Sequence, residues 1–134
     1  MIVVDTNILL YYTVKSPNNE TAVQVYAKDP VWVAPFLWRS EFRNSTLLYL
    51  RKEILTLGQV LKIVQTAERM MRDHEFHIVA ADVYRLATQS SCSAYDCEFV
   101  ALAQELRVKL VTADKQVLHD FPETAVSPAQ FIQQ

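Results

Sequence analysis

Four acidic residues lie where apolar segments end or helices begin, and they are the residues of this sequence whose types and positions could support chemistry. Asp5 closes the apolar run MIVV, and Asp114 follows the apolar pair LV and Thr112. Asp96 opens the segment YDCEFVALAQEL, and Glu41 lies in RSEFRN. Carboxylates that faced one pocket would repel one another unless a cation neutralised them. Hard oxygen ligands favour Mg²⁺ or Mn²⁺, which can activate water and hold a phosphate.

Glu41 is the acid whose position is hardest to explain as an ordinary surface charge. We expect a helix over 37–52, on which one face comprises Leu37, Glu41, Asn44 and Leu48. This face is apolar at both ends, so the pattern predicts that Glu41 and Asn44 lie within an apolar arc. Arg39 and Arg43 fall on the other side of the helix, where solvated charges belong. A carboxylate among buried residues needs a partner, which is either a basic side chain or a metal ion.

Each aspartate also has an ordinary structural role available. Asp5 can cap a helix that starts at Thr6 or Asn7, and Asp114 can cap the short helix after it. Ser93 and Asp96 fit a capping box, with serine first and an acid three residues later. Capping and a role in a site do not exclude each other, so both readings stay open.

Short apolar segments alternate with helical ones along the chain. Strands are expected at 1–5, 31–35, 75–80, 109–112 and 124–127, and helices at 6–14, 19–29, 37–52, 56–72, 81–90, 93–106, 113–121 and from 128. This alternation predicts an α/β fold: a three-layer α/β/α domain over 1–134 with a short parallel sheet of about four to five strands. Sites in such sheets form beyond the carboxyl ends of the strands, where Asp5 and Asp114 are placed.

The composition excludes several classes of protein. The chain has 134 residues, of which 51% are hydrophobic and 21% charged, and this indicates one globular domain. A single glycine, Gly58, rules out a glycine-rich phosphate loop. No apolar run approaches the roughly 20 residues that span a bilayer, and MIVVDTN does not resemble a signal peptide, so we expect a cytoplasmic protein without membrane contact. Cys92 and Cys97 are expected to be reduced, and no zinc-ligand spacing is present.

The segments VVDTN, RSEFRN, SAYDCEFVALAQEL and LVTAD, in this order, resemble PIN-domain ribonucleases, and in particular the VapC toxins of VapBC toxin–antitoxin pairs. The resemblance covers essentially the whole chain. It implies that Asp5, Glu41 and Asp96 are the core acids and that Asp114 is the more variable fourth. These four would bind Mg²⁺, with Mn²⁺ as an alternative, and catalyse RNA hydrolysis. Supporting polar positions would be Thr6, Asn7, Asn44 and Thr112.

The same resemblance implies partners: an RNA substrate, a VapB-type antitoxin and a second copy of the chain in a homodimer. Lys115 is the first candidate for contact with RNA phosphate, followed by Arg39 and Arg43. Two rival functions remain open. The chain is a non-catalytic PIN-fold binding module if the acids serve only as caps. A receiver-like phosphate-signalling domain fits less well, because Asp5 has no adjacent acidic partner.

Overall fold

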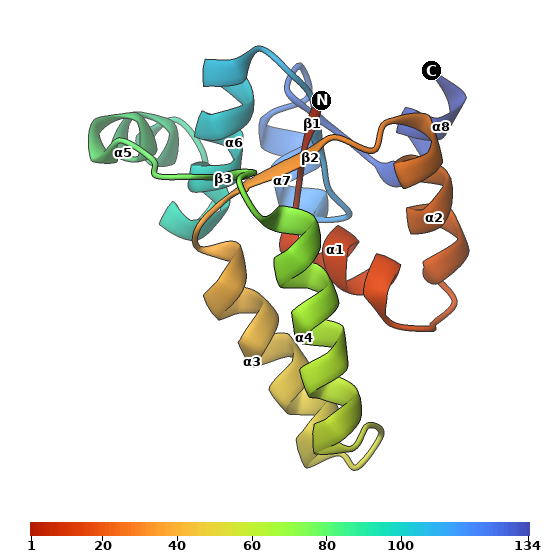
Figure 1. Cartoon of the computed structure of the whole chain (residues 1–134). Helices are drawn as coiled ribbons and strands as arrows, with labels where there is room; N and C mark the ends of the chain where they lie inside the picture. The colour runs from red at the N-terminus through yellow and green to blue at the C-terminus, as the bar shows by residue number, and fades with distance from the viewer.

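The computed structural model describes all residues from 1 to 134 as one α/β unit (Figure 1). Its five strands are β1 (Ile2–Val4), β2 (Trp32–Pro35), β3 (Glu75–Phe76), β4 (Leu110–Val111) and β5 (Ala125–Val126). Its eight helices are α1 (Thr6–Thr13), α2 (Asn19–Lys28), α3 (Trp38–Arg51), α4 (Leu57–Met71), α5 (Ala80–Thr88), α6 (Ala94–Leu106), α7 (Lys115–Asp120) and α8 (Pro128–Gln133). The predicted α/β fold and the order of its elements are confirmed.

The strands form one parallel sheet in the order β3-β2-β1-β4-β5. The chain moves outward from β1 through β2 to β3, and then returns to add β4 and β5 on the other side of β1. The strand order therefore reverses between β1 and β4, which is the point where doubly wound sheets bind their ligands. Val4 lies opposite Val111 in the register, so Asp5 and Thr112 leave the sheet side by side.

Helices cover both faces of this sheet and bury its strands. Right-handed crossovers place α1 to α4 on one face and α5 to α7 on the other. α4 packs on β2, whereas α6 packs on β1, β2 and β4 from behind in the view of Figure 1. β1, β2, β4 and β5 are buried at every position, which explains their uninterrupted apolar sequences. A single core of 30 buried residues results.

Two sequence-based boundaries need correction at the edge of the sheet. The segment 75–80 was expected to be one strand, but β3 contains only Glu75 and Phe76, and Ala80 already begins α5. β3 is an edge strand that pairs with β2 alone, so few hydrogen bonds hold it extended. No helix of the chain is both long enough and apolar enough to cross a membrane.

α3 is anchored to β3 by a pair of charged side chains. The Arg39 guanidinium donates from Nε and Nη2 to the Glu75 carboxylate at 2.5 and 2.9 Å, and Trp38 Nε1 adds a third hydrogen bond at 2.8 Å. The Glu75 side chain is only 6% exposed, so these donors replace the water that it loses on folding. The anchor fixes the first turns of α3, which carry Glu41 two residues beyond Arg39.

Acid is expected to weaken this anchor. Hydrogen bonds from Arg39 hold the pKa of Glu75 below its ordinary value of 4.5, although burial acts in the opposite direction. The stabilisation is therefore complete above pH 4.5 and is lost as the pH falls toward the lowered pKa. The difference in thermal unfolding midpoint between wild type and Glu75→Gln should accordingly be larger at about pH 7 than at about pH 3. An equal difference at both pH values would contradict this account.

Candidate metal site

Asp5 and Thr112 meet at the switch point of the sheet. Thr112 Oγ1 donates to Asp5 Oδ2 at 2.7 Å, and the Thr6 N–H donates to Asp5 Oδ1 at the same distance. Asp5 is thus the N-cap of α1, as expected, but Thr112 is fully buried and holds the second oxygen. The carboxylate at the end of β1 is fixed by one donor from each of the two segments that leave the sheet here.

Glu41 reaches the same edge from α3. The Thr6 hydroxyl donates to Glu41 Oε1 at 2.7 Å, so Thr6 connects Glu41 with Asp5. The predicted apolar arc through Leu48 and Asn44 is wrong, since Leu48 is 49% exposed and Asn44 is also exposed. The buried face of α3 instead comprises Trp38, Phe42 and Thr46. Glu41 lies beside that face and is half-buried, so its partial burial was predicted correctly for an incorrect reason.

Asp96 arrives on the first turn of α6. A helix that crosses over between parallel strands runs back along the sheet, so its N-terminus lies near the carboxyl edge. Ser93 Oγ accepts the Asp96 N–H at 3.1 Å, which forms half of the expected capping box. The reciprocal bond, in which the Ser93 N–H would donate to the Asp96 carboxylate, is absent. The carboxylate of Asp96 forms no hydrogen bond within the chain and is available for another partner.

Asp114 stands at the start of α7, next to the end of β4. Its Oδ1 accepts the N–H groups of Gln116 and Val117 at 2.9 and 3.1 Å, so it is the N-cap of α7, as expected. Its own N–H donates to Thr112 Oγ1 at 3.0 Å. Thr112 therefore contacts both Asp5 and Asp114 and positions the two acids relative to each other.

The four acids influence one another electrostatically. Burial raises the pKa of Asp5, hydrogen bonds from Thr112 and Thr6 lower it, and the charges of Asp96 and Asp114 raise it further, with a net increase. Burial also raises the pKa of Glu41, and the charges of Asp5 and Asp96 add to this increase. No basic side chain takes part in either shift, and none of the four acids forms an ion pair. The site therefore concentrates negative charge that the protein does not neutralise.

The donor set fits a hard divalent cation, although its side chains are not gathered around a single point. Carboxylate and hydroxyl oxygens without histidine or thiolate are typical of Mg²⁺ and Mn²⁺ sites. In this structure no three acidic, histidine or cysteine side chains converge closely enough to hold one ion. Asp5, Glu41 and Asp114 each turn toward their own hydrogen-bond donors, as mutually repelling carboxylates do. Binding of one ion by several of them requires rotation of these side chains.

The remaining candidate residues, which are two asparagines and three basic side chains, do not hydrogen-bond to the four acids. Asn7 and Asn44 are exposed and form no side-chain hydrogen bond within the chain. Lys115 and Arg43 are exposed and unpaired, whereas Arg39 is held by Glu75 and Glu68. Of the three basic candidates for RNA contact, Lys115 lies nearest in sequence to an acid of the site.

Sequence reasoning missed one acid, Glu98. Burial raises its pKa, and its charge contributes to the raised pKa of Glu41. Glu98 lies two residues after Asp96 on α6, where the two side chains point in different directions around the helix. Its place beside α3 depends on how α6 packs on the sheet, so helical spacing alone gave no signal for it.

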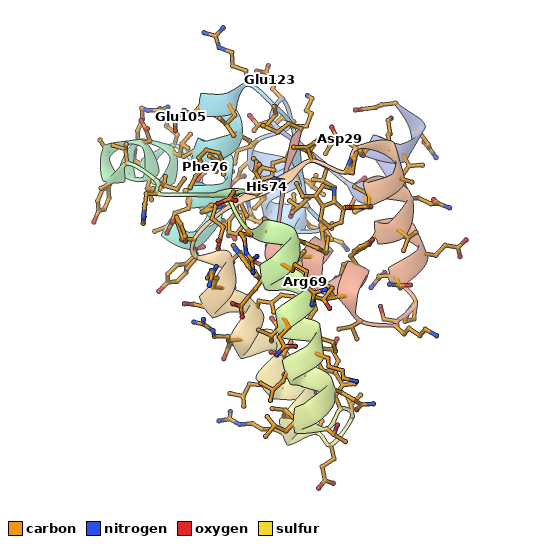
Figure 2. The ribbon with its side chains drawn as sticks, viewed as in Figure 1. Asp29, Arg69, His74, Phe76, Glu105 and Glu123 are labelled. Carbon is orange, nitrogen blue, oxygen red and sulfur yellow. The ribbon has the colours of Figure 1, made fainter.

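The acids of other surfaces lie away from this edge. Asp29, Glu105 and Glu123 are found toward the end of the molecule where β1 begins (Figure 2). Asp29 is bound there by the N-terminal ammonium group at 2.6 Å. Both cysteines are free, as predicted, and both are buried; burial raises the pKa of Cys92 to about 12. None of the three histidines contacts the four acids of the site. His74 contacts Trp32, His77 stacks on Phe36, and His119 contacts Asp120.

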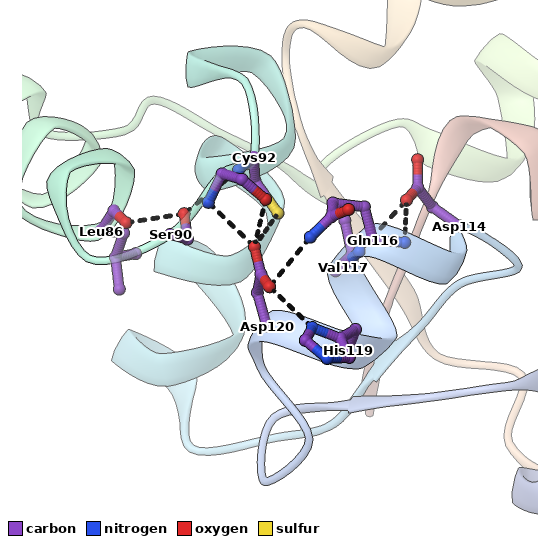
Figure 3. A network of polar contacts seen from close by, with 9 residues as sticks. Leu86, Ser90, Cys92, Asp114, Gln116, Val117, His119 and Asp120 are labelled. Carbon is purple, nitrogen blue, oxygen red and sulfur yellow. Dashed lines mark hydrogen bonds and ion pairs between the residues drawn. The ribbon is translucent and has the colours of Figure 1, made fainter.

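Asp120 joins the two helices that present Asp96 and Asp114 (Figure 3). Its Oδ2 accepts from both the N–H and the hydroxyl of Ser91 at 2.9 Å, and Gln116 Nε2 donates to its Oδ1 at 2.9 Å. The Ser91 loop leads directly into α6, and Gln116 belongs to the first turn of α7. Asp120 thereby ties the start of α6 to α7.

Replacement of Asp120 by alanine should loosen this connection. We expect the dissociation constant for Mg²⁺ to rise roughly 10- to 100-fold, as is usual when a group that supports metal ligands is removed. Excess Mg²⁺ should still saturate the site, because the ligands themselves remain. The measurement is the thermal unfolding midpoint against free Mg²⁺ for wild type, Asp120→Asn and Asp120→Ala. An unchanged Mg²⁺ dependence in Asp120→Ala would exclude this positioning role.

Comparison with known proteins agrees with the fold. The family model described as PIN domain matches residues 2–124. Ribonuclease VapC3 of Pyrobaculum aerophilum is 33% identical over 54 residues, which are 40% of this chain and 41% of that protein, so the match spans less than half of the length of that relative.

Solved structures show the same fold over nearly the whole chain. The crystal structure of PAE2754 from Pyrobaculum aerophilum has a TM-score of 0.78 at 14% identity and covers 98% of this chain and 93% of that one. The crystal structure of FitAcB from Neisseria gonorrhoeae has a TM-score of 0.70 at 17% identity, with 96% and 99% covered. With a family model that matches from β1 to the residue before β5, this chain belongs to the PIN-domain family.

Proposed function

We propose that this chain is a Mg²⁺-dependent endoribonuclease and the toxin of a toxin–antitoxin pair. The observation that carries the proposal is the group of four acids around the switch point, which no basic side chain neutralises; burial raises the pKa of Asp5, and the charges of Asp96 and Asp114 raise it further. Such a cluster creates a demand for a cation. Membership of the PIN-domain family and the partial match to ribonuclease VapC3 support RNA as the substrate.

The four acids divide two tasks in this proposal. Asp5, Asp96 and Asp114 would hold the metal, and Mn²⁺ would serve in place of Mg²⁺. The bound ion would lower the pKa of water and stabilise negative charge on the phosphate. Glu41 is oriented by the Thr6 hydroxyl, and its raised pKa suits it to take a proton from the attacking water. In-line attack on phosphorus would leave a 5′-phosphate and a 3′-hydroxyl.

Cleavage of purified total RNA tests the proposal. The protein is freed of any co-purifying partner and incubated with RNA in Mg²⁺, in Mn²⁺ and in excess EDTA. We expect discrete fragments with 5′-phosphate ends in either metal and none in EDTA. Fragments that end in a cyclic phosphate would refute the hydrolytic mechanism, and a folded, metal-binding protein that cuts no RNA would favour a non-catalytic PIN-fold binding module.

The toxin role requires protein partners, which we propose from the resemblance to VapC: an antitoxin and a second copy of the chain. The α3–α4 hairpin projects from the body of the molecule (Figure 1). Near its tip, four large apolar side chains are 49 to 61% exposed: Leu48, Ile54, Leu57 and Leu61. Exposed apolar groups gathered on one element are typical of an interface between proteins.

A further inference from the structure

A cavity of about 420 Å³ adjoins the acidic edge on the side of α2 and α8. Ala113 and Lys115 line one wall, and these residues flank Asp114 in the sequence. Ile8 and Tyr11 line another wall and belong to α1, the helix that Asp5 caps. None of the four acids lines the cavity itself, but a strand of nucleic acid whose phosphate lay at these acids can place a neighbouring nucleotide in it.

The walls of the cavity combine apolar surface with a few polar groups. Six of its eleven residues are hydrophobic, and they include the aromatic side chain of Tyr11. Asn18, Thr21 and Ser127 contribute amide and hydroxyl groups to the lining. Single-stranded RNA is recognised in this way, by apolar and aromatic contacts with the faces of unstacked bases and by hydrogen bonds to their edges. The volume lies within the roughly 300–1,000 Å³ of small-ligand pockets, which suits one nucleotide and not a duplex.

A basic side chain, Lys115, lies at the boundary between the cavity and the acids. Lys115 is exposed and forms no ion pair within the chain. Its ammonium group complements a backbone phosphate, which a strand would place between a cleaved position and a neighbouring base. This charge favours a nucleotide over an apolar protein side chain as the occupant.

We propose that this cavity binds the unstacked base of a nucleotide next to the scissile phosphate, with Lys115 on the phosphate that connects them. The cavity thereby contributes to the choice of cleavage site. This inference rests on the proposed ribonuclease function and adds to it a subsite that recognises one base of the substrate.

The test uses an abasic scan of the substrate. The cleavage site is mapped in total RNA, and a short synthetic oligoribonucleotide that spans it is made with an abasic nucleotide at each position in turn. Stacking of one base contributes a factor of roughly 5 to 150 in affinity, so abasic substitution at one position beside the cut should raise KM by that factor. Substitution at the other positions should have smaller effects.

Two variants connect that position to the cavity. Ala129→Phe fills the cavity from α8 without touching the acids, and it should raise KM for the intact substrate while abolishing the difference between intact and abasic substrates. Ala81→Phe is the matched control, because both alanines are exposed at the second position of a helix. Lys115→Gln should weaken all substrates uniformly and leave the abasic preference in place.

The outcomes separate this proposal from the ribonuclease function. If wild type cleaves RNA but Ala129→Phe retains the full abasic preference, the cavity does not hold the base and the proposal is wrong, while the nuclease stands. If Ala129→Phe instead leaves every substrate unaffected and weakens only the binding of a co-purifying protein, the cavity belongs to that protein. Absence of any RNA cleavage by wild type overturns both.

Discussion

Replacement of Asp5 by asparagine is expected to reduce the rate of RNA cleavage about 1,000-fold. Metal ions supply several kcal/mol of transition-state stabilisation, and each 1.36 kcal/mol corresponds to a factor of ten in rate. Asp5 lies at the centre of the four acids, with Thr112 and the Thr6 N–H fixing its two oxygens. Asp96→Asn should have a comparable effect, because the carboxylate of Asp96 has no structural hydrogen bond to make and is free to bind the metal.

The Asp5→Asn substitution should not unfold the protein. Since the pKa of Asp5 is raised, its ionised form is less favourable in the folded protein than in the unfolded chain at neutral pH. Asparagine removes that charge, so the thermal midpoint in metal-free buffer should stay the same or rise. Asp82→Asn, which affects an exposed ion pair on α5, is the matched control and should leave the rate unchanged. Retention of wild-type cleavage by Asp5→Asn would remove Asp5 from the mechanism.

Arg39→Ala should be the most destabilising of the changes considered, by about 2–4 kcal/mol. It leaves the Glu75 carboxylate, which is 6% exposed, with only the Trp38 N–H as a side-chain donor. Leaving the buried Glu75 carboxylate unpaired costs more free energy than the attraction to Arg39 that is lost. The expected destabilisation is smaller than that for a fully buried ion pair, because the Arg39 side chain is 34% exposed. The midpoint should fall by roughly 10 °C, measured by circular dichroism.

Arg43→Ala provides the control for this change. Arg43 lies one turn further along α3, is exposed and has no ionic partner, so its removal should shift the midpoint by very little. If Arg39→Ala behaves like Arg43→Ala, the contact with Glu75 does not stabilise α3. A loss of cleavage in Arg39→Ala is to be interpreted only alongside its stability, since the loosened helix also carries Glu41.

The sequence predicted the parts of the fold that depend on local pattern. Apolar runs identified the strands, and because parallel strands end at one edge, Asp5 and Asp114 were placed together correctly. Capping by Asp5, Ser93 and Asp114 followed from their positions before helices and is confirmed. These features need only the neighbours of a residue along the chain.

What the sequence did not predict depends on contacts between distant segments. Glu75 takes Arg39 as its partner from 36 residues away, and Thr112 reaches Asp5 from 107 residues away. Leu48 is exposed because the far half of α3 leaves the sheet to form the projecting hairpin with α4, which helical spacing cannot reveal. Glu98 was missed for the same reason, since its proximity to Glu41 arises from the packing of α6.

Metal titration tests most directly whether the four acids form one site. Thermal unfolding of EDTA-treated protein is followed as free Mg²⁺ or Mn²⁺ is increased. Three proteins are compared: wild type, the double variant Asp5→Asn/Asp96→Asn, and the control Asp82→Asn. We predict that metal stabilises wild type and Asp82→Asn, by about 2.7 kcal/mol at a hundred times the dissociation constant, and not the double variant. No metal-dependent stabilisation of wild type, or the same stabilisation in the double variant, would contradict the assignment of Asp5 and Asp96 to a metal site.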